Sequence, residues 1–356
     1  EIDLTAYFAH TCKWTVEIHD VERIPELLHR AFHTARSGRP GPVVVALPHD
    51  MLEDSADEDV DLWQKNIGNV NTVQPNEESV NQAAEMIDRS KRPVVIAGGG
   101  IIRSGATPLL ETFVEQRQLP VVTAFRRYDA FPNDHHCYAG WLGFGPDPQL
   151  LNYIQNADLV IALGTRFSQV TTQNYQLLQP GAQLIHVDLS SDIFGKVYSP
   201  ALPIQADVKV FLEKMTEQEP KSVTDRDIMV EKLHEAYLAF SDPKQRYSDQ
   251  VVDLDGMMFD FVRHAPKDTI ITSDAGNFFG WLARYYRFKK PGTYIGPTSG
   301  AMGYGLPAAV GAKIAWPGRQ VISFSGDGGF MMTLQELDTS IRYNAPIVAI
   351  VVNNNL

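Results

Sequence analysis

The sequence is poor in cysteine, in long apolar runs and in basic residues. These shortages argue, in turn, against a cysteine-based metal site, a membrane-spanning helix and nonspecific nucleic-acid binding. Its two cysteines, Cys12 and Cys137, lie far apart and show no metal-ligand spacing, which predicts ordinary thiols in a reducing cytoplasm. No run approaches the roughly 18 apolar residues of a membrane-spanning helix. The chain has 31 basic and 43 acidic residues, and its net charge of −12 argues against nonspecific nucleic-acid binding. We therefore expect a cytoplasmic protein with neither a membrane nor a nucleic-acid partner.

Composition and length are those of a globular protein with more than one domain. Hydrophobic residues make up 44% and charged residues 21% of the 356 positions, which is ordinary for soluble domains. A chain of this length favours two or three hydrophobic cores. The sequence opens on EIDLTAYF without an initiator methionine and ends directly after a strand-like run. We expect a fragment of a longer protein, cut at both ends.

Hydrophobic periodicity divides the chain into structured blocks joined by polar stretches. The central block alternates apolar strands such as ADLVIALG with helical spans, the pattern of a parallel sheet covered on both faces. The predicted fold class is α/β, with parallel sheets flanked by helices and a Rossmann-like central domain. The predicted segments are, in order, the closing piece of an α/β domain at 1–52, an acidic linker at 53–76, the central domain at 77–215, a second linker at 216–248 and part of a last domain at 249–356.

The last block places polar residues at the ends of two apolar strands. VISFS leads into the GDGG sequence of 326–329, a helix-like span follows, and the strand predicted over 347–352 ends in three asparagines. A strand, a crossover helix and a parallel strand bring both carboxyl ends to one sheet edge, so Asp327 and Asn354 can meet there. Their oxygens suit Mg²⁺, and the glycines suit a phosphate. Taken alone, GDGG is also explained as a glycine-rich turn before a helix, with Asp327 as the N-cap of that helix.

Three stretches resemble one enzyme family. GDGGFMMTLQELDTSIRYNAPIVAIVVNNN looks like the thiamin-diphosphate motif, in which GDG is followed at a distance by NN. SGAMGYGLPAAVGAKIAWPGR and SGRPGPVVVALPHDML are similar to the acetolactate synthase branch of that family. The chain thus resembles the large, catalytic subunit of acetolactate synthases. The resemblance runs from the end of a pyrimidine-binding domain through a central domain into the first part of a diphosphate-binding domain.

The resemblance implies roles for individual residues. Asp327 and Asn354 match side-chain ligands of Mg²⁺, and Leu356 takes the place of a third ligand, for which only its backbone carbonyl is suited. Met302 matches the residue that supports the bent cofactor, whereas Phe278 departs from the usual histidine and offers no hydrogen bond. The residues at cofactor-binding positions are Gly276, Asn277, Gly300, Met302, Gly326, Asp327, Gly328, Gly329 and Asn354.

The resemblance also implies an activity, namely decarboxylation of a 2-oxo acid and carboligation with thiamin diphosphate and Mg²⁺. Acetolactate synthase-like chemistry, from pyruvate to acetolactate, is the first expectation. Benzoylformate decarboxylase-like and sulfoacetaldehyde acetyltransferase-like enzymes stay open, as does an inert nucleotide-binding homologue. The family's catalytic glutamate lies upstream of the matching region, so no catalytic residue is assigned and the fragment alone is expected to be inactive. Family active sites form between subunits, which implies a homodimer or homotetramer, and a small regulatory subunit stays open.

For the central block, the sequence leaves open whether the domain binds a flavin or an adenine nucleotide. IAGGGIIRSG follows a strand but lacks the G-x-G-x-x-G spacing, which disfavours a nucleotide-dependent dehydrogenase. Some acetolactate synthases hold FAD here with an RFDDR-like segment; RFSQV at 166–170 departs from it, so FAD stays open and is not favoured. Asp188 either meets a ribose hydroxyl or caps the next turn. His135 and His136 form a loop pair without a third ligand, which is rarely a metal site.

Overall fold

The chain divides into two compact units, Glu1–Val73 and Gln74–Leu356. The residues described by the structure, a computed structural model, are 2–55, 70–221, 226–247 and 252–354. Most of the predicted linker 53–76 lies outside these residues. In the ranges that are described, no helix is long and apolar enough to cross a membrane.

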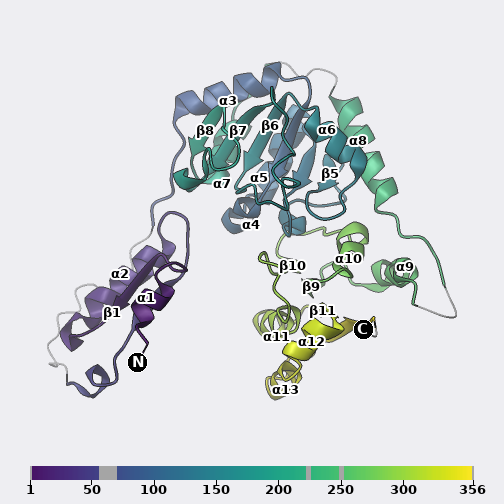
Figure 1. Ribbon diagram of the computed structural model, residues 1–356. Helices are drawn as coiled ribbons and strands as arrows, with labels where there is room; N and C mark the ends of the chain where they lie inside the picture. Colours follow the sequence, from purple (N-terminus) through teal and green to yellow (C-terminus); the bar gives the residue numbers. More distant parts are fainter. Residues whose placement is uncertain (1, 56–69, 222–225, 248–251, 355–356) are drawn as a thin grey trace. The chain divides into compact units, whose positions relative to one another are not determined.

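Unit 1 is a small α/β piece built on two parallel strands (Figure 1). Its elements are α1 (Leu4–Phe8), β1 (Trp14–Glu17), the 3₁₀ helix η1 (Val21–Arg23), α2 (Ile24–Arg36), β2 (Val43–Ala46) and the 3₁₀ helix η2 (Met51–Glu53). Helix α2 is the crossover between the paired strands. The core of the unit is small, with Ile18, Leu27 and Met51 buried. A two-stranded sheet of this kind buries little apolar surface.

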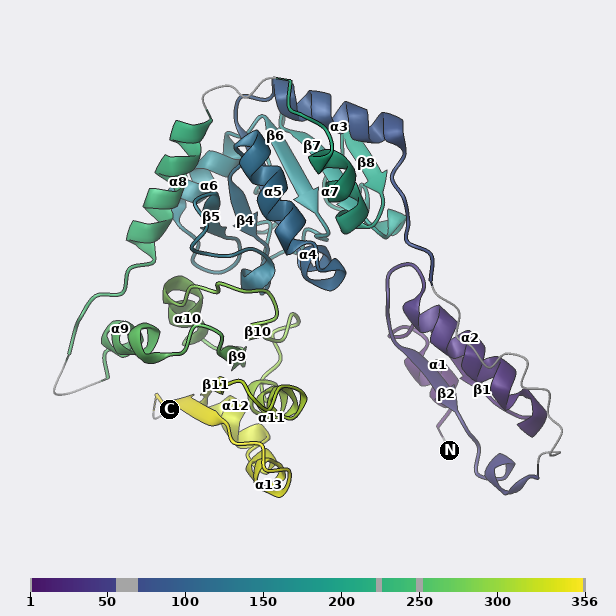
Figure 2. The same cartoon turned by 180° about the vertical axis from the view of Figure 1, so that it is seen from behind.

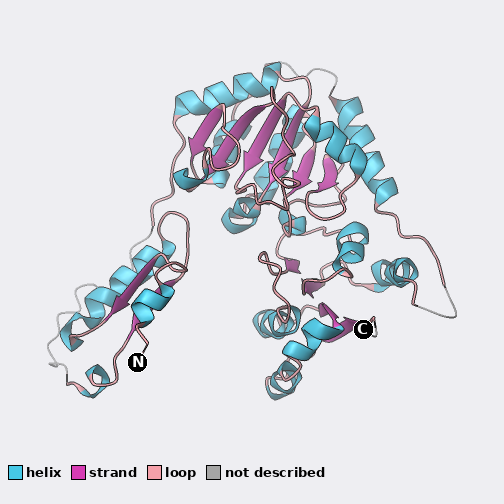
Figure 3. Ribbon diagram, in the orientation of Figure 1, coloured by secondary structure: helices cyan, strands magenta, loops and turns pink. Residues whose placement is uncertain are grey.

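The first part of unit 2 is a six-stranded parallel sheet (Figure 3). Its elements are α3 (Glu77–Arg89), β3 (Pro93–Ala97), α4 (Gly99–Ser104), α5 (Thr107–Arg117), β4 (Val121–Thr123), η3 (Tyr128–Ala130), β5 (Tyr138–Trp141), α6 (Pro148–Gln155), β6 (Leu159–Leu163), β7 (Gln183–Asp188), η4 (Ser191–Ile193), β8 (Leu202–Gln205), α7 (Val208–Thr216) and α8 (Asp227–Phe240). The strand order is β5-β4-β3-β6-β7-β8, and every pair is parallel.

Strand β3 shows that helices cover both faces of this sheet, because successive side chains of a strand point to opposite faces. Val94 and Ile96 belong to one hydrophobic cluster, which includes residues of α6. Val95 and Ala97 belong to another, which includes residues of α3, α5 and α7. The predicted parallel sheet flanked by helices is confirmed, and Figure 2 shows the helices of the second cluster from their own side.

The second part of unit 2 is a four-stranded parallel sheet in the order β10-β9-β11-β12. Its elements are α9 (Leu254–His264), β9 (Ile270–Ser273), α10 (Phe279–Tyr285), β10 (Tyr294–Ile295), α11 (Gly305–Ala315), β11 (Val321–Gly326), α12 (Asp327–Met332), α13 (Glu336–Arg342) and β12 (Val348–Val352). Ile270 packs with residues of α11 on one face, and Ile271 packs in the cluster that includes residues of α9 and α10. Helices therefore cover both faces of β9.

Two segments differ in detail from the sequence prediction. The polar stretch 216–248 contains the helix α8, whose Val230 and Tyr237 are buried in the large cluster of the central sheet. These residues lie two turns apart on one face of a helix that is itself rich in apolar residues. The single helix expected before the last strand is divided into α12 and α13, with a break at 333–335.

Buried polar contacts join the two sheets of unit 2. The Asp129 carboxylate, on the loop after β4, accepts hydrogen bonds from the backbone N–H groups of Thr293 and Tyr294, at 3.0 and 3.2 Å. Arg126 on the same loop is buried, donates from Nη1 to the Tyr294 hydroxyl at 3.2 Å, and lies over the ring of Phe279 at 4.5 Å. These contacts hold the segment after β4 against the start of β10 and against α10.

Candidate cofactor and metal site

The carboxyl ends of β11 and β12 lie side by side at one edge of the four-stranded sheet. The register pairs Gly326 with Val352, so Asp327 and Asn353 leave the two strands at the same level, and Asn354 follows. Helix α12 begins at Asp327 itself, with Gly326 at the N-cap position. The alternative in which Asp327 only caps a later helix start is therefore wrong. Leu356, the predicted backbone ligand, lies outside the described residues.

A third strand end, that of β9, borders this edge. β9 pairs with β11, and the backbone N–H of Asp274 donates to the carbonyl of Phe324 at 3.0 Å. Gly276 and Asn277 follow and are exposed. The ring of Phe278 turns inward and is buried: a β-carbon added to Gly276 would lie 2.6 Å from its Cε1 atom. Phe278 thus fills space beneath the loop rather than offering a polar group to a ligand.

The loop before α11 also approaches the GDGG turn. Gly300 has a φ of +75°, a backbone conformation that glycine adopts without strain. Met302 is 48% exposed. A β-carbon added to Gly328 would lie 3.2 Å from the Met302 Cε atom, so this side chain stands directly against the turn. Of the predicted residues, Gly326, Asp327, Gly328, Gly329 and Asn354 lie at the ends of β11 and β12, Gly276 and Asn277 follow the neighbouring β9, and Met302 contacts Gly328. Gly300 lies two residues before Met302 in the same loop, and among the described residues the structure shows no contact between it and the turn.

The chemistry of this edge fits a metal-bridged diphosphate. Asp327 and Asn354 supply hard oxygen donors, which Mg²⁺ prefers. Gly328 is exposed and Gly326 is partly exposed, and without side chains both let an anion approach the backbone N–H groups closely. The exposed Met302 offers apolar surface beside them.

Sequence reasoning missed one residue that joins these segments, namely Asp274. Its side chain is 1% exposed, and its Oδ1 atom accepts hydrogen bonds from the backbone N–H groups of Tyr304 and Gly305 at 2.6 and 2.7 Å. A usable signal was present, because SDAG at the end of β9 repeats the arrangement of SGDG at the end of β11. In both, an aspartate and a glycine follow a buried strand at its carboxyl end.

The glycine-rich turn after β3 has a packing explanation. A β-carbon on Gly98 would lie 2.2 Å from the carbonyl oxygen of Gly164, and one on Gly100 would lie 2.7 Å from the Gly164 Cα atom. The glycines therefore allow the turns after β3 and β6 to touch. The Nε atom of Arg127 stands 2.7 Å from a β-carbon position on Gly99 and covers that residue. Asp188 accepts a hydrogen bond from the N–H of Ser190 at 3.0 Å, which supports the turn-capping alternative.

The His135–His136 pair has a third potential metal ligand nearby that sequence reasoning did not count. The ligand atoms of His135, His136 and Cys137 lie within 4.8 Å of one another. Both ring nitrogens of His135 are already engaged, Nε2 with Glu115 at 3.0 Å and Nδ1 with the N–H of Cys137 at 3.1 Å. Burial raises the pKa of the Cys137 thiol to about 12. A metal ion would have to displace a hydrogen bond of His135 and the tightly held proton of the Cys137 thiol. The hydrogen bonds and the burial of these side chains account for their arrangement without a metal.

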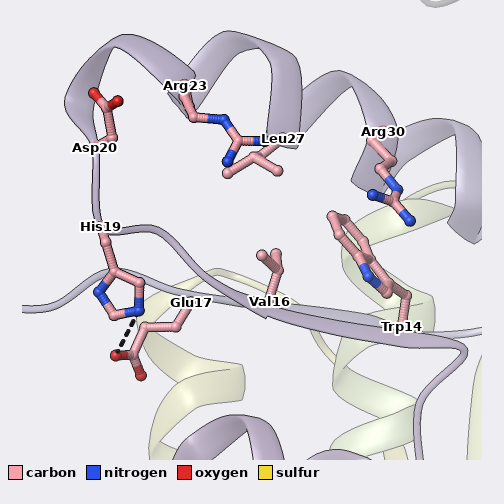
Figure 4. Close-up of a pocket in the computed structure, with 8 residues that line it drawn as sticks. All are labelled: Trp14, Val16, Glu17, His19, Asp20, Arg23, Leu27 and Arg30. Carbon is pink, nitrogen blue, oxygen red and sulfur yellow. Dashed lines mark ion pairs between the residues drawn. The ribbon is translucent and has the colours of Figure 1, made fainter.

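Unit 1 has an open hollow between β1 and α2 (Figure 4). The residues around it are Trp14, Val16, Glu17, His19, Asp20, Arg23, Leu27 and Arg30. Its polar groups are engaged with one another or with neighbours: Arg30 lies 4.4 Å from the centre of the Trp14 ring, and His19 lies 3.5 Å from Glu17. The hollow contains none of the predicted site residues.

Comparison with known proteins places both parts of unit 2 in one family. The model of the thiamine pyrophosphate enzyme central domain matches residues 80–215, and the model of the C-terminal TPP binding domain of thiamine pyrophosphate enzymes matches residues 274–356. Together they cover more than half of the chain.

Curated relatives align with nearly the whole chain. The probable acetolactate synthase large subunit of Methanocaldococcus jannaschii is 32% identical over 99% of this chain and 62% of its own length. The acetolactate synthase isozyme 3 large subunit of Escherichia coli is 32% identical over 99% of this chain and 63% of its own length. The acetolactate synthase large subunit of Lactococcus lactis is 31% identical over the full chain and 62% of its own length. The chain thus spans about three fifths of these relatives, and it belongs to the family of thiamine pyrophosphate (thiamin diphosphate) enzymes.

Proposed function

We propose that the whole protein acts on a 2-oxo acid with thiamin diphosphate and Mg²⁺, and that it converts pyruvate to acetolactate. The observation that carries the proposal is the parallel pairing of Gly326 with Val352, which brings Asp327 and Asn354 to one exposed edge beside the GDGG turn. The family of both matched domains supports the cofactor, and the names of the relatives support the reaction.

Each segment of the edge has a role in this proposal. Asp327, Asn354 and the carbonyl of Leu356 would ligate Mg²⁺. The GDGG backbone would bind the diphosphate, Asn277 would donate a hydrogen bond to it, and Met302 would offer apolar support to the cofactor. When bound, thiamin diphosphate supplies the nucleophilic carbon and the electron sink that decarboxylation needs. The protein orients the reacting groups and keeps water away from them.

We also propose that the whole protein forms at least a homodimer. Apolar side chains of α12, α13 and the loops beside them are exposed in the described chain, and burial of such a surface favours association. The exposed residues are Met331, Met332, Leu334, Leu337, Ile341 and Tyr343. Because the relatives are named large subunits, a smaller partner subunit belongs to the proposal too. A cytoplasmic location fits such an enzyme.

FAD is not part of the favoured proposal. The turn glycines after β3 are accounted for by packing against Gly164, and Arg127 covers Gly99. The Asp188 carboxylate, the candidate for a ribose hydroxyl, holds the N–H of Ser190. A titration of the whole protein with FAD, followed by flavin fluorescence, tests this directly. Saturable binding would add FAD as a structural cofactor.

The proposed reaction is tested with the whole protein, thiamin diphosphate, Mg²⁺ and pyruvate. Acetolactate is measured as acetoin after acid treatment, and carbon dioxide release is measured in parallel. We expect both products, and we expect both to disappear when Mg²⁺ is chelated. Carbon dioxide without acetolactate would indicate a decarboxylase, and benzoylformate and sulfoacetaldehyde serve as alternative substrates. Absence of turnover with all three, in a protein that binds the cofactor, would favour an inert homologue.

A further inference from the structure

Asp274 lies where three segments of the candidate site meet. It directly follows β9, and its backbone N–H pairs with the carbonyl of Phe324 in β11 at 3.0 Å. The side chain is 1% exposed. Burial of a carboxylate destabilises the folded state unless hydrogen bonds replace those that it made with water.

One oxygen of the carboxylate holds the beginning of α11. Oδ1 accepts hydrogen bonds from the backbone N–H groups of Tyr304 at 2.6 Å and Gly305 at 2.7 Å. These groups are among the donors that a helix N-terminus leaves without intrahelical partners, and a negative charge is favourable there. The residues just before them form the loop that carries Gly300 and Met302. Asp274 therefore anchors the end of that loop to β9.

The other oxygen faces the GDGG turn. Oδ2 has no hydrogen-bond partner within the described part of the chain. A β-carbon added to Gly329 would lie 2.6 Å from it and 3.2 Å from the Asp274 Cγ atom. Gly329 can therefore pack against the carboxylate only because it lacks a side chain. On the neighbouring residue, a β-carbon on Gly328 would lie 3.2 Å from Met302. The GDGG turn is thus in contact with Asp274 and with the loop that Asp274 anchors.

We propose that Asp274 is a positioning residue for the cofactor site. By bonding the start of α11 and packing on Gly329, it sets the distance between the loop of Gly300 and Met302 and the GDGG turn. The affinity for thiamin diphosphate with Mg²⁺ should depend on that distance, because both segments belong to the proposed binding site of that one ligand. This inference rests on the proposed function and adds a residue that acts through the segments it holds in place.

The test compares two substitutions at Asp274 with a matched control. Asp274→Ala removes both hydrogen bonds, whereas Asp274→Asn keeps an oxygen that can accept them. Asp129→Ala is the control, because Asp129 is also a buried carboxylate that accepts two backbone N–H groups, but on Thr293 and Tyr294. Each whole-protein variant is titrated with thiamin diphosphate in the presence of Mg²⁺ and followed by near-UV circular dichroism. Melting without cofactor and the KM for pyruvate at saturating cofactor are measured alongside.

Asp274→Ala is expected to raise the half-saturating cofactor concentration about tenfold or more, since a charge-assisted contact is lost. Asp274→Asn should stay close to wild type, and Asp129→Ala should lower the melting temperature without weakening cofactor binding. The KM for pyruvate should change little in all three. Equal cofactor affinity for Asp274→Ala and the control would overturn the inference. A wild-type protein that binds no thiamin diphosphate would remove the proposed function, and this inference with it.

A double substitution examines the contact with Gly329. Gly329→Ala alone should weaken cofactor binding, because its methyl group would press on the carboxylate. In the Asp274→Ala background the same methyl group has room, so the double variant should bind no more weakly than Asp274→Ala by itself. Two independent effects would instead multiply. A multiplied loss would show that Gly329 and Asp274 act separately and would contradict the coupling.

Discussion

The two sheets of unit 2 are both parallel and flanked by helices, but they differ in how completely their strands are buried. In the central sheet, every residue of β3 and of β6 is buried, because helices cover both faces. In the four-stranded sheet, the last strand β12 has Val348 44% and Val351 38% exposed, and the neighbouring α13 has Ile341 79% exposed. The predicted ligands lie beside this open strand. Within unit 2, the region that supplies most of the core is therefore separate from the region that carries the candidate chemistry.

The largest expected effect is on the free energy of unfolding. It should differ strongly between a substitution in the core of the central sheet and one on the exposed helix beside β12. Phe113 on α5 is 0% exposed, so Phe113→Ala should lower the free energy of unfolding by about 3–5 kcal/mol. Ile341→Ala on α13 should change it by about 0.5 kcal/mol or less in the dissociated protein, because that side chain is already in water. Urea unfolding at low protein concentration measures both. A loss at Ile341 comparable to that at Phe113 would show that its exposed surface is covered in solution.

Substitution of the proposed metal ligands should affect binding and leave the central sheet unchanged. Asp327→Ala should weaken Mg²⁺-dependent binding of thiamin diphosphate by roughly 1.5–3 kcal/mol, about tenfold to over a hundredfold. Asn354→Ala should weaken it less, since an amide contributes a dipole and a carboxylate a full charge. Cofactor titration with and without Mg²⁺ gives both values.

Asp338→Ala is the matched control for Asp327→Ala. Asp338 is an exposed carboxylate on α13 that pairs with Arg342 at 2.5 Å. It should leave cofactor affinity unchanged. If Asp327→Ala behaves in the same way while it remains folded, the metal assignment is wrong.

Assembly should depend on the open sheet and not on the central one. Ile341→Lys places a charge in the exposed apolar surface of α13 and should raise the dissociation constant of the dimer by about tenfold or more, since burial of an unpaired charge is unfavourable. Sedimentation velocity of the whole protein across a concentration series measures the change. A wild-type protein that is monomeric at micromolar concentration and fully active would contradict the proposed dimer.

The smallest effect should appear at the contact that joins the two sheets. Burial raises the pKa of Asp129, although the N–H groups of Tyr294 and Thr293 oppose the shift. A raised pKa means that the folded state favours the protonated acid. Its contribution to stability is therefore full below the unfolded pKa of about 3.9 and is lost as the pH rises through the folded value.

The difference between wild type and Asp129→Asn isolates this contribution. Melting temperatures of both proteins, compared at a series of pH values upward from the unfolded pKa, should show that the melting temperature of wild type falls relative to that of the variant as the pH rises. A gain for wild type over the same range would mean that the backbone hydrogen bonds outweigh burial and that the pKa is lowered instead.

Much of the architecture was predictable because it follows from local periodicity. The continuous apolar runs around Val95 and Ile161 indicate strands buried on both faces, and both lie in the central parallel sheet. The proximity of Asp327 and Asn354 was predictable from chain order, since a parallel crossover places successive strand ends on one edge. The helix α8 was missed although its sequence, DIMVEKLHEAYLAF, is rich in apolar residues. The break between α12 and α13 was missed because a local chain turn leaves a weak pattern.

The sequence by itself determined the order of strands and helices and the grouping of Asp327 with Asn354. Both follow from short-range patterns of period two and 3.6 and from the fixed handedness of crossovers. Only the tertiary structure decided that Asp274 bonds the start of α11 and that Gly98 is a glycine because Gly164 touches it. Such contacts join residues through the packing of separate elements. No local pattern records where a side chain will meet a group that the folded chain brings to it.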